Sequence, residues 1–235
     1  MRPLYWDFMI ENIWVIARGI PYSLEIAVIA LFFGFFIGLI TALARMYKVP
    51  VLNQISSIYI AIIRGTPLLI QILICYYGIP RLLQYINYVY NLNFNINSIP
   101  PIFFVFFCFS IYTGSYLSET IRGCILSVDP GQMEACYSVG MTTTKGMMRV
   151  VLPQAMISAV PNIANQFIGL IKDASLAFVI AIPEILGQAK IVAGRSSKFL
   201  EAYLVAAAWY FIICWICQRF INIIERRINR QQKKA

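Results

Sequence analysis

Long apolar runs separated by short polar segments are the main pattern of this 235-residue chain. A helix that crosses the hydrocarbon core of a bilayer needs about 20 mostly apolar residues. Runs of that length predict membrane spans at about 20–44, 53–79, 100–121, 159–182 and 201–221. The pattern therefore predicts an all-α membrane protein with five transmembrane helices in a single domain over residues 1–235.

The segments outside these runs have a different character. Residues 1–18 mix aromatic and acidic side chains, including Trp6 and Asp7, and predict an amphipathic helix that leads into the first span at the membrane interface. The segment 88–99 is rich in asparagine and predicts a loop outside the hydrocarbon. Residues 225–235 form a basic, polar tail.

Composition agrees with a membrane protein and excludes several site types. The chain is 60% hydrophobic and 12% charged, whereas a soluble domain is nearer half apolar and a quarter charged. Most of the six cysteines fall inside apolar runs, so we predict no disulfide framework. Cys214 and Cys217 lie within a span, and no histidine is available to complete a metal site with them. We therefore expect no metal and no cofactor.

The distribution of basic residues predicts the orientation in the membrane, because cytoplasmic segments carry an excess of Lys and Arg. With five spans, one side collects eleven cations: Arg45, Lys48, Arg122, Lys145, Arg149, Arg219, Arg226, Arg227, Arg230, Lys233 and Lys234. The other side has six: Arg2, Arg18, Arg81, Lys190, Arg195 and Lys198. The C-terminus and the segment 129–154 are therefore predicted to be cytoplasmic. The basic tail is better explained by anionic lipid than by nucleic acid.

The segment 129–154 is polar and is interrupted by proline and glycine residues, although it lies between long apolar runs. Pro130 and Gly131 mark a turn, and Glu134 opens a short helical pattern. Gly140 can end that pattern by adopting backbone angles closed to other residues. A short helix, a glycine elbow and a second helix predict a projection that fits a groove in a partner.

This segment resembles the loop signature of the membrane subunits of bacterial ABC importers, most closely the polar amino acid branch. The matching residues are Glu134, Ala135, Gly140, Leu152 and Pro153. Cys136 and Val150 depart conservatively from the usual Ala and Ile. The resemblance implies a cytoplasmic coupling helix, with Glu134, Ala135, Gly140 and Pro153 docking into an ATPase subunit. The alternative is an amphipathic connector without a partner.

Charges inside predicted spans are functional-site candidates, because charge at membrane depth is costly. Arg64 lies in I-I-R-G-T-P-L-L-I-Q, where Gly65 and Pro67 would break the helix. Lys172 and Asp173 are adjacent in N-Q-F-I-G-L-I-K-D-A-S-L. Broken helices are tolerated where they line a cavity, and transporters use them to bind substrate. Arg64 and Asp173 are a plausible pair; the alternative is that these charges form buried ion pairs that only fix helix register.

These two segments, together with I-P-E-I-L at 182–186, are similar to polar amino acid importer permeases, so the likeness covers about 19–227. The likeness implies the type I ABC importer permease fold in the bacterial cytoplasmic membrane. It also implies three partners: a cytoplasmic ATP-binding subunit, a second permease copy or homologue, and an extracytoplasmic amino-acid-binding protein. This chain has no G-x-x-x-x-G-K-[ST] phosphate loop. We therefore predict a transport subunit that is not itself an enzyme.

The substrate is inferred from departures within the likeness. Permeases for cationic amino acids often carry Glu where this chain has Ala61 and Gln166. A desolvated cation without a partner is costly, so we predict a polar neutral amino acid such as cystine or glutamine. The segments Y-K-V-P-V-L-N-Q and Y-Y-G-I-P resemble cystine permeases. The predicted substrate-binding residues are Arg64, Gly65, Thr66, Gln71, Asn165, Gln166, Lys172, Asp173 and Ser175.

Two other classes of protein are alternatives to an ATP-driven importer. A secondary transporter driven by an ion gradient would have similar broken helices, but paired inverted repeats are not visible in the sequence. An intramembrane enzyme would need a nucleophile and a base. Ser175 and Lys172 lie three residues apart on one helical face and are the only candidate pair.

Overall fold

The computed structural model describes residues 4–92 and 95–232, with side chains up to Arg226. The cations Arg2, Lys233 and Lys234 lie outside the described residues, as do the side chains of Arg227 and Arg230.

The described chain is helical throughout its regular elements. The α-helices are α1 (Trp6–Ala17), α2 (Ile20–Met46), α3 (Leu52–Gly65), α4 (Leu68–Tyr90), α5 (Pro101–Leu126), α6 (Pro130–Ser138), α7 (Thr143–Gly146), α8 (Leu152–Asp173), α9 (Ile185–Ser196) and α10 (Phe199–Gln232). Three short helices join them: the 3₁₀-helices η1 (Ile96–Ser98) and η3 (Ala174–Ile180), and the π-helix η2 (Met147–Val151).

Five helical segments of the described chain are long and apolar enough to cross a membrane. They are Trp6–Met46, Leu68–Tyr90, Pro101–Leu126, Thr143–Ile180 and Phe199–Arg226. This finding confirms the predicted all-α membrane class.

The second predicted span differs in its bounds. The run 53–79 is divided between α3 and α4, which are separated at Thr66 and Pro67. The membrane-length helix is α4, which continues to Tyr90. The prediction that the loop begins at residue 88 was therefore wrong at its start. The helix ends where Asn91 adopts a left-handed conformation with φ 51°, a conformation that asparagine tolerates better than most residues.

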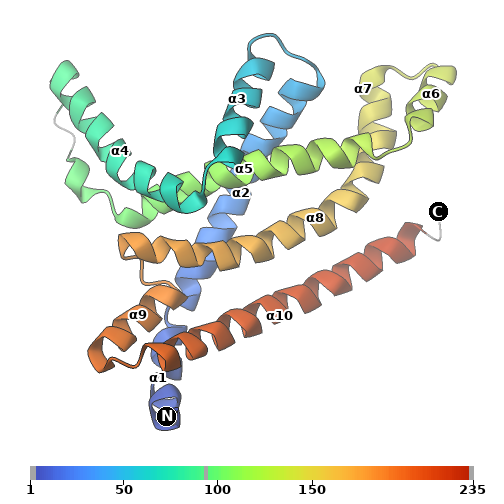
Figure 1. The fold of residues 1–235 in the computed structure, drawn as a ribbon. Coiled ribbons are helices and arrows are strands. Elements are labelled where there is room, and N and C mark those ends of the chain that lie inside the picture. The colour runs from blue at the N-terminus through green and yellow to red at the C-terminus, as the bar shows by residue number, and fades with distance from the viewer. Residues whose placement is uncertain (1–3, 93–94, 233–235) are drawn as a thin grey trace.

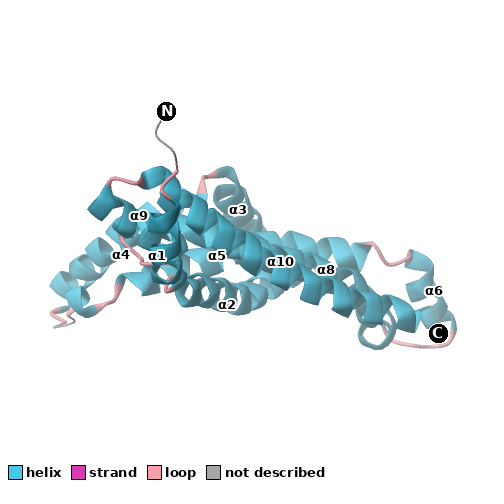
Figure 2. Ribbon diagram, turned by 90° about the horizontal axis from the view of Figure 1, so that it is seen from below, coloured by secondary structure: helices cyan, strands magenta, loops and turns pink. Residues whose placement is uncertain are grey.

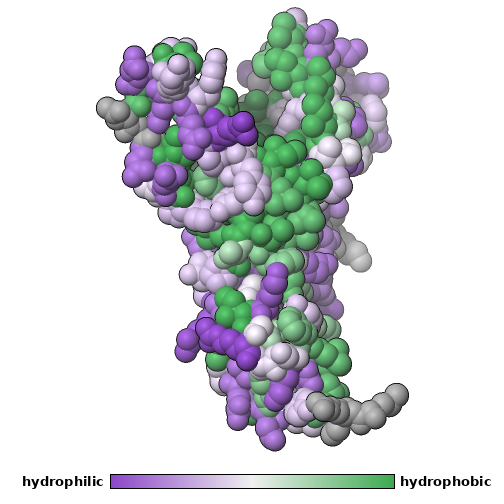
Figure 3. Space-filling view, turned by 60° about the vertical axis from the view of Figure 1, so that its left-hand side comes forward, coloured by the Kyte–Doolittle hydropathy of each residue, from purple (hydrophilic) through white to green (hydrophobic). Residues whose placement is uncertain are grey.

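The views in Figures 1 and 2 agree on the two ends of the molecule. The projection α6–α7 and the C-terminal part of α10 lie at one end, while α1 and α9 lie at the opposite end. Figure 3 shows one side of the molecule, where hydrophobic residues cover the middle and hydrophilic residues gather around the lower part. A hydrophobic middle is what contact with lipid requires.

The contact between α2 and α5 is the most extensive helix pairing of the described chain. Gly34 and Gly38 lie one turn apart on α2, and α5 contributes Gly114. A Cβ on Gly34 would lie 2.7 Å from Cβ of Thr113, and one on Gly114 would lie 2.6 Å from Cγ2 of Ile37. Glycines four residues apart let membrane helices approach this closely. The G-x-x-x-G spacing at 34–38 is visible in the sequence and is typical of a close helix contact in membranes, but the predictions above did not use it.

A second close contact fixes the bend between α1 and α2. A Cβ on Gly19 would lie 2.4 Å from the backbone of Glu184, just before α9. On the other side of α1, Trp209 of α10 donates a 2.9 Å hydrogen bond to the carbonyl of Ile13. These contacts hold the leading helix against α9 and α10 at the end opposite α6.

Replacing Gly34 by alanine should force α2 and α5 apart. We expect the free energy of unfolding in detergent to fall by about 1–3 kcal/mol, the usual cost of overpacking. Gly123→Ala on α5 is the matched control, because a Cβ there would meet no atom within 4 Å. Alanine is the better helix former, so the control should be unchanged or slightly stabilised. Equal thermal unfolding of the two variants would contradict this account of the interface.

Candidate functional site

The break between α3 and α4 is held together by one amide side chain. Gln71 is buried, and its Nε2 donates to the carbonyl oxygens of Ile63 at 2.7 Å and Thr66 at 3.0 Å. It also lies 2.9 Å from Oγ1 of Thr66. Backbone carbonyls freed by a helix break need such partners inside a membrane. The amide nitrogen of Gln71 is therefore occupied in stabilising the break.

Arg64 stands at the C-terminal end of α3 and is exposed in the single chain. Its guanidinium lies over the ring of Tyr116 on α5, 5.1 Å from the ring centroid. Tyr116 in turn packs against Tyr112, one turn earlier, with 4.8 Å between centroids. A cation over an aromatic face is stabilised by the ring quadrupole. Sequence analysis missed both tyrosines, although their i,i+4 spacing inside a span was visible.

The proposed pairing of Arg64 with Asp173 is not observed. Within the described side chains no ion pair joins the two residues, and the cation of Arg64 lies on Tyr116 instead. Asp173 is half-buried at the C-terminal end of α8, a helix that contacts α5. Arg64 and Asp173 therefore do not pair within the described side chains.

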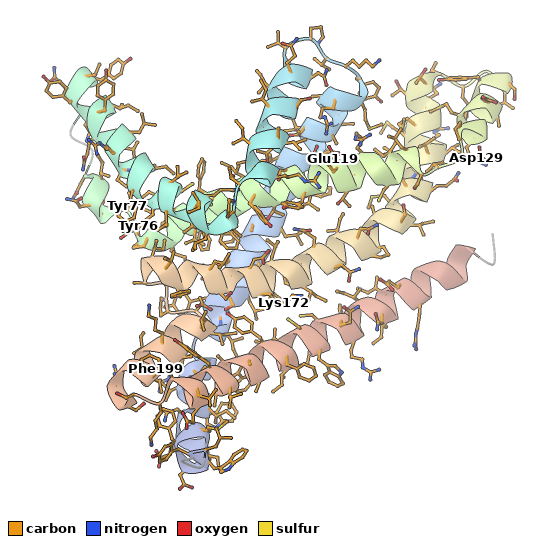
Figure 4. All side chains as sticks on the ribbon, viewed as in Figure 1. Tyr76, Tyr77, Glu119, Asp129, Lys172 and Phe199 are labelled. Carbon is orange, nitrogen blue, oxygen red and sulfur yellow. The ribbon has the colours of Figure 1, made fainter. Side chains whose placement is uncertain are left out.

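Lys172 points elsewhere. Figure 4 places it in the space between α8 and α10. Neighbouring residues on a helix do not share a face, so Lys172 and Asp173 separate as expected.

The remaining predicted substrate residues are dispersed. The hydroxyl of Thr66 donates to the carbonyl of Ile62 at 2.9 Å, and Gly65 beside it is exposed. On α8, Asn165 is exposed and Gln166 is partly buried. Ser175 is partly buried in η3, and no hydrogen bond joins it to Lys172 in the described part of the chain.

An acidic residue missed by the sequence analysis joins α2 to α5. Glu119 accepts hydrogen bonds from Nε and Nη2 of Arg122, at 3.1 and 2.9 Å, and from Nη1 of Arg45 at the end of α2. Figure 4 shows Glu119 on α5, close to where α2 and α3 pass. It was detectable as the only acidic residue in the third predicted span.

A second missed carboxylate lies at the opposite end, between the spans Thr143–Ile180 and Phe199–Arg226. Glu184 is fully buried and caps α9 by accepting from the backbone N–H groups of Leu186 and Gly187, at 2.9 and 2.7 Å. The hydroxyl of Tyr210 donates to it at 2.6 Å. Burial raises the pKa of the Glu184 carboxyl from its ordinary value, although these hydrogen bonds act in the opposite direction. This cluster fastens α9 to α10.

The segment 129–154 forms the helix, elbow and helix that the pattern predicted. Asp129 caps the start of α6 (Figure 4), and its carboxylate accepts a hydrogen bond from the N–H of Gly131 at 2.8 Å. Gly140 has φ +77°, the left-handed conformation expected of the elbow. Glu134, Ala135 and Pro153 are all exposed.

The two sides of this projection are packed tightly together. A Cβ on Gly146 of α7 would lie 2.8 Å from Sδ of Met133 and 3.1 Å from Cβ of Cys136. Cys136 is buried against Gly146. Only a residue as small as glycine therefore fits at position 146. Across the base, Gln154 donates to Gln132 at 3.0 Å. The exposed side of α6 is therefore carried on a compact base that continues into α8.

Comparisons with known proteins cover nearly the whole chain. The family model described as "Binding-protein-dependent transport system inner membrane component" matches residues 34–230. The L-cystine transport system permease protein TcyB of Bacillus subtilis (strain 168) is 39% identical over 231 residues, which are 97% of this chain and 93% of that protein. The probable glutamine ABC transporter permease protein GlnP of the same organism is 35% identical, over 94% of this chain and 95% of its own.

A solved structure has the same fold. A crystal structure of an amino acid ABC transporter with histidines contains a chain that is 31% identical, with a TM-score of 0.84. The match covers 97% of this chain and 100% of that one.

Replacing Gln71 by leucine should destabilise the break between α3 and α4. The substitution removes an amide that bonds two backbone carbonyls, and leaving a buried polar group unsatisfied costs about 1–3 kcal/mol. We expect a lower unfolding temperature in detergent, with faster proteolysis between α3 and α4. Gln54→Leu is the matched control, because Gln54 is exposed on α3 and in none of the hydrogen bonds of the break. A variant as stable as this control would show that Gln71 does not hold the break.

Proposed function

Because this chain belongs to the family of binding-protein-dependent transport system inner membrane components, we propose that it forms the membrane pathway of an ATP-driven amino acid importer. One observation carries this proposal. Arg64 lies on Tyr116, and Tyr116 and Glu119 share one side of α5, which leads directly into the exposed helix α6. A polar route through the membrane is thereby joined to a projecting helix.

Family membership confirms the resemblance inferred from the segment 129–154. It also confirms that the chain is a multi-pass inner membrane transport subunit rather than an enzyme. The family match and the solved amino acid transporter structure together confirm the type I importer permease fold.

We infer that the working unit contains two permeases, this chain with a second copy or a homologue. Arg64 is exposed in the single chain, and Tyr116 beneath it is only partly buried. A charge at this depth does not face lipid but faces protein or a water-filled cavity. A second permease laid against this face would enclose the charges in a shared pathway.

The projection α6–α7 is the coupling element in this proposal. Glu134 and Ala135, together with the exposed Tyr137 and Val139, present a small mixed surface to the cytoplasmic ATP-binding subunit. Only residues 127–129 separate α5 from α6. A displacement of α6 by the ATPase would therefore be transmitted to the helix that carries Tyr112, Tyr116 and Glu119.

Contact between α6–α7 and a cytoplasmic ATPase would also set the orientation of the chain in the membrane. The C-terminus lies in the cytoplasm with α6 and α7, in keeping with the excess of basic residues at that end. The opposite end, formed by α1 and α9, faces outward. An extracytoplasmic amino-acid-binding protein delivers substrate there.

The substrate in this proposal is a polar neutral amino acid, such as cystine or glutamine. Arg64 attracts the carboxylate, and Asp173 at the end of α8 attracts the ammonium group. Ala61 and Gln166 supply no carboxylate for a cationic side chain. The relatives named for cystine and glutamine transport support this class of substrate.

Reversing the charge of Glu134 should uncouple the ATPase. We expect Glu134→Arg to abolish the stimulation of ATP hydrolysis by loaded binding protein, because a cation replaces a carboxylate on the docking surface. The measurement is ATPase activity of the co-purified complex in proteoliposomes. Glu225→Arg, near the C-terminal end of α10 and outside the projection α6–α7, is the matched control and should retain stimulation. If this chain takes up amino acid along an ion gradient without an ATPase, a secondary transporter replaces the importer.

A carboxylate at position 166 should change charge selectivity. In the purified permease–ATPase complex, measured without binding protein by equilibrium dialysis, we expect Gln166→Glu to strengthen L-arginine binding about tenfold, as a new charge-assisted hydrogen bond would. Gln54→Glu, exposed on α3, is the control and should have no effect. Unchanged arginine affinity in Gln166→Glu would remove Gln166 from the cavity.

A further inference from the structure

Two arginines close to the coupling end of the molecule share one carboxylate. Arg45 is the penultimate residue of α2, and Arg122 lies four residues before the end of α5. Both bind Glu119, and we call the three residues the arginine clasp. The clasp carries two cations and one anion, so its formal charge is +1.

Most of the N–H donors of Arg45 and Arg122 make no hydrogen bond within the described side chains. A guanidinium has five N–H donors, and Glu119 is bonded only through Nη1 of Arg45 and through Nε and Nη2 of Arg122. No other partner is found for either guanidinium among the described side chains. The side chains of Arg45 and Arg122 are 23% and 36% exposed, so the remaining donors are accessible. Paired guanidiniums with accessible donors are suited to a carboxylate or phosphate.

The clasp continues the row of polar side chains that begins at the tyrosine pair. Tyr112, Tyr116, Glu119 and Arg122 are spaced by four, three and three residues along α5, so they lie on one side of the helix. Arg64 lies on Tyr116, in the middle of this row. The row thus leads from the proposed substrate site toward α6. A charged row within a span does not face hydrocarbon.

We propose that Arg45 and Arg122 form a second binding station for the carboxylate of the transported amino acid, between Arg64 and the cytoplasm. This inference rests on the proposed function. Glu119 acts as a positioning residue, because its carboxylate holds the two guanidiniums together against their mutual repulsion. The ligand class is an α-amino acid that carries a free carboxylate.

The shared carboxylate also keeps the second station weak. Glu119 neutralises one of the two cations, so an arriving anion meets a net charge of +1 rather than +2. A pathway needs sites that bind firmly enough to admit the substrate and weakly enough to release it. The clasp meets both requirements at the end of the pathway where release occurs.

The test measures substrate transported per ATP hydrolysed. The complete importer is reconstituted in phosphatidylcholine vesicles, with and without phosphatidylglycerol, and L-cystine and L-glutamine serve as probes. We expect Arg122→Gln to lower uptake per ATP about tenfold, the effect of one lost hydrogen bond to a charged group. Arg122→Lys should retain part of the uptake, because it keeps the charge.

Lys48→Gln is the matched control, since Lys48 is an exposed cation next to α2 that has no bond to Glu119. Uptake per ATP that is equal in Arg122→Gln and Lys48→Gln would overturn the inference while leaving the importer intact.

Two other results would also overturn it. A loss confined to vesicles with phosphatidylglycerol would assign the clasp to lipid headgroups. A loss matched by falling ATPase activity and unfolding temperature would assign it to fastening α2 and α5. If the wild-type complex transports neither probe in response to ATP, the proposed function and this inference fail together.

Discussion

The glycine contact between α2 and α5 is the constraint on which the other helices depend. Lipid offers no hydrophobic driving force between helices, so close packing must supply the stability. Gly34 and Gly114 allow that packing because any side chain there would overlap the facing helix. With the two helices in contact, Arg45 of one reaches Glu119 of the other. The core contact thus sets the position of the charged residues.

The break between α3 and α4 is the second organising feature, and it depends on the first. Tyr59 of α3 donates to the carbonyl of Ile111 on α5, so the α2–α5 pair also positions α3. Gln71 then satisfies the carbonyls where α3 ends. The outcome is that the guanidinium of Arg64 lies over the ring of Tyr116. The break between α3 and α4, which would be costly in hydrocarbon, therefore places the charge of Arg64 against α5.

The same helix connects the charges to the coupling projection. Tyr112, Tyr116 and Glu119 lie on α5, which reaches α6 through three residues. At the far end, Gly19 and the buried Glu184 fix α1, α9 and α10 to one another. Motion at α6 would therefore be transmitted to the tyrosine pair and the clasp, while the end formed by α1 and α9 stays assembled.

The sequence by itself determined the helical class, the number of spans, the helix break after Arg64 and the elbow at Gly140. These features are local, because span length, helix breaking and left-handed turns depend on neighbouring residues. Only the tertiary structure decided which residues meet. Arg64 lies on Tyr116 and not on Asp173, and Glu119 gathers two arginines. These contacts join helices far apart in the chain, and a single sequence records residue types along a helix but not how neighbouring helices are rotated against each other.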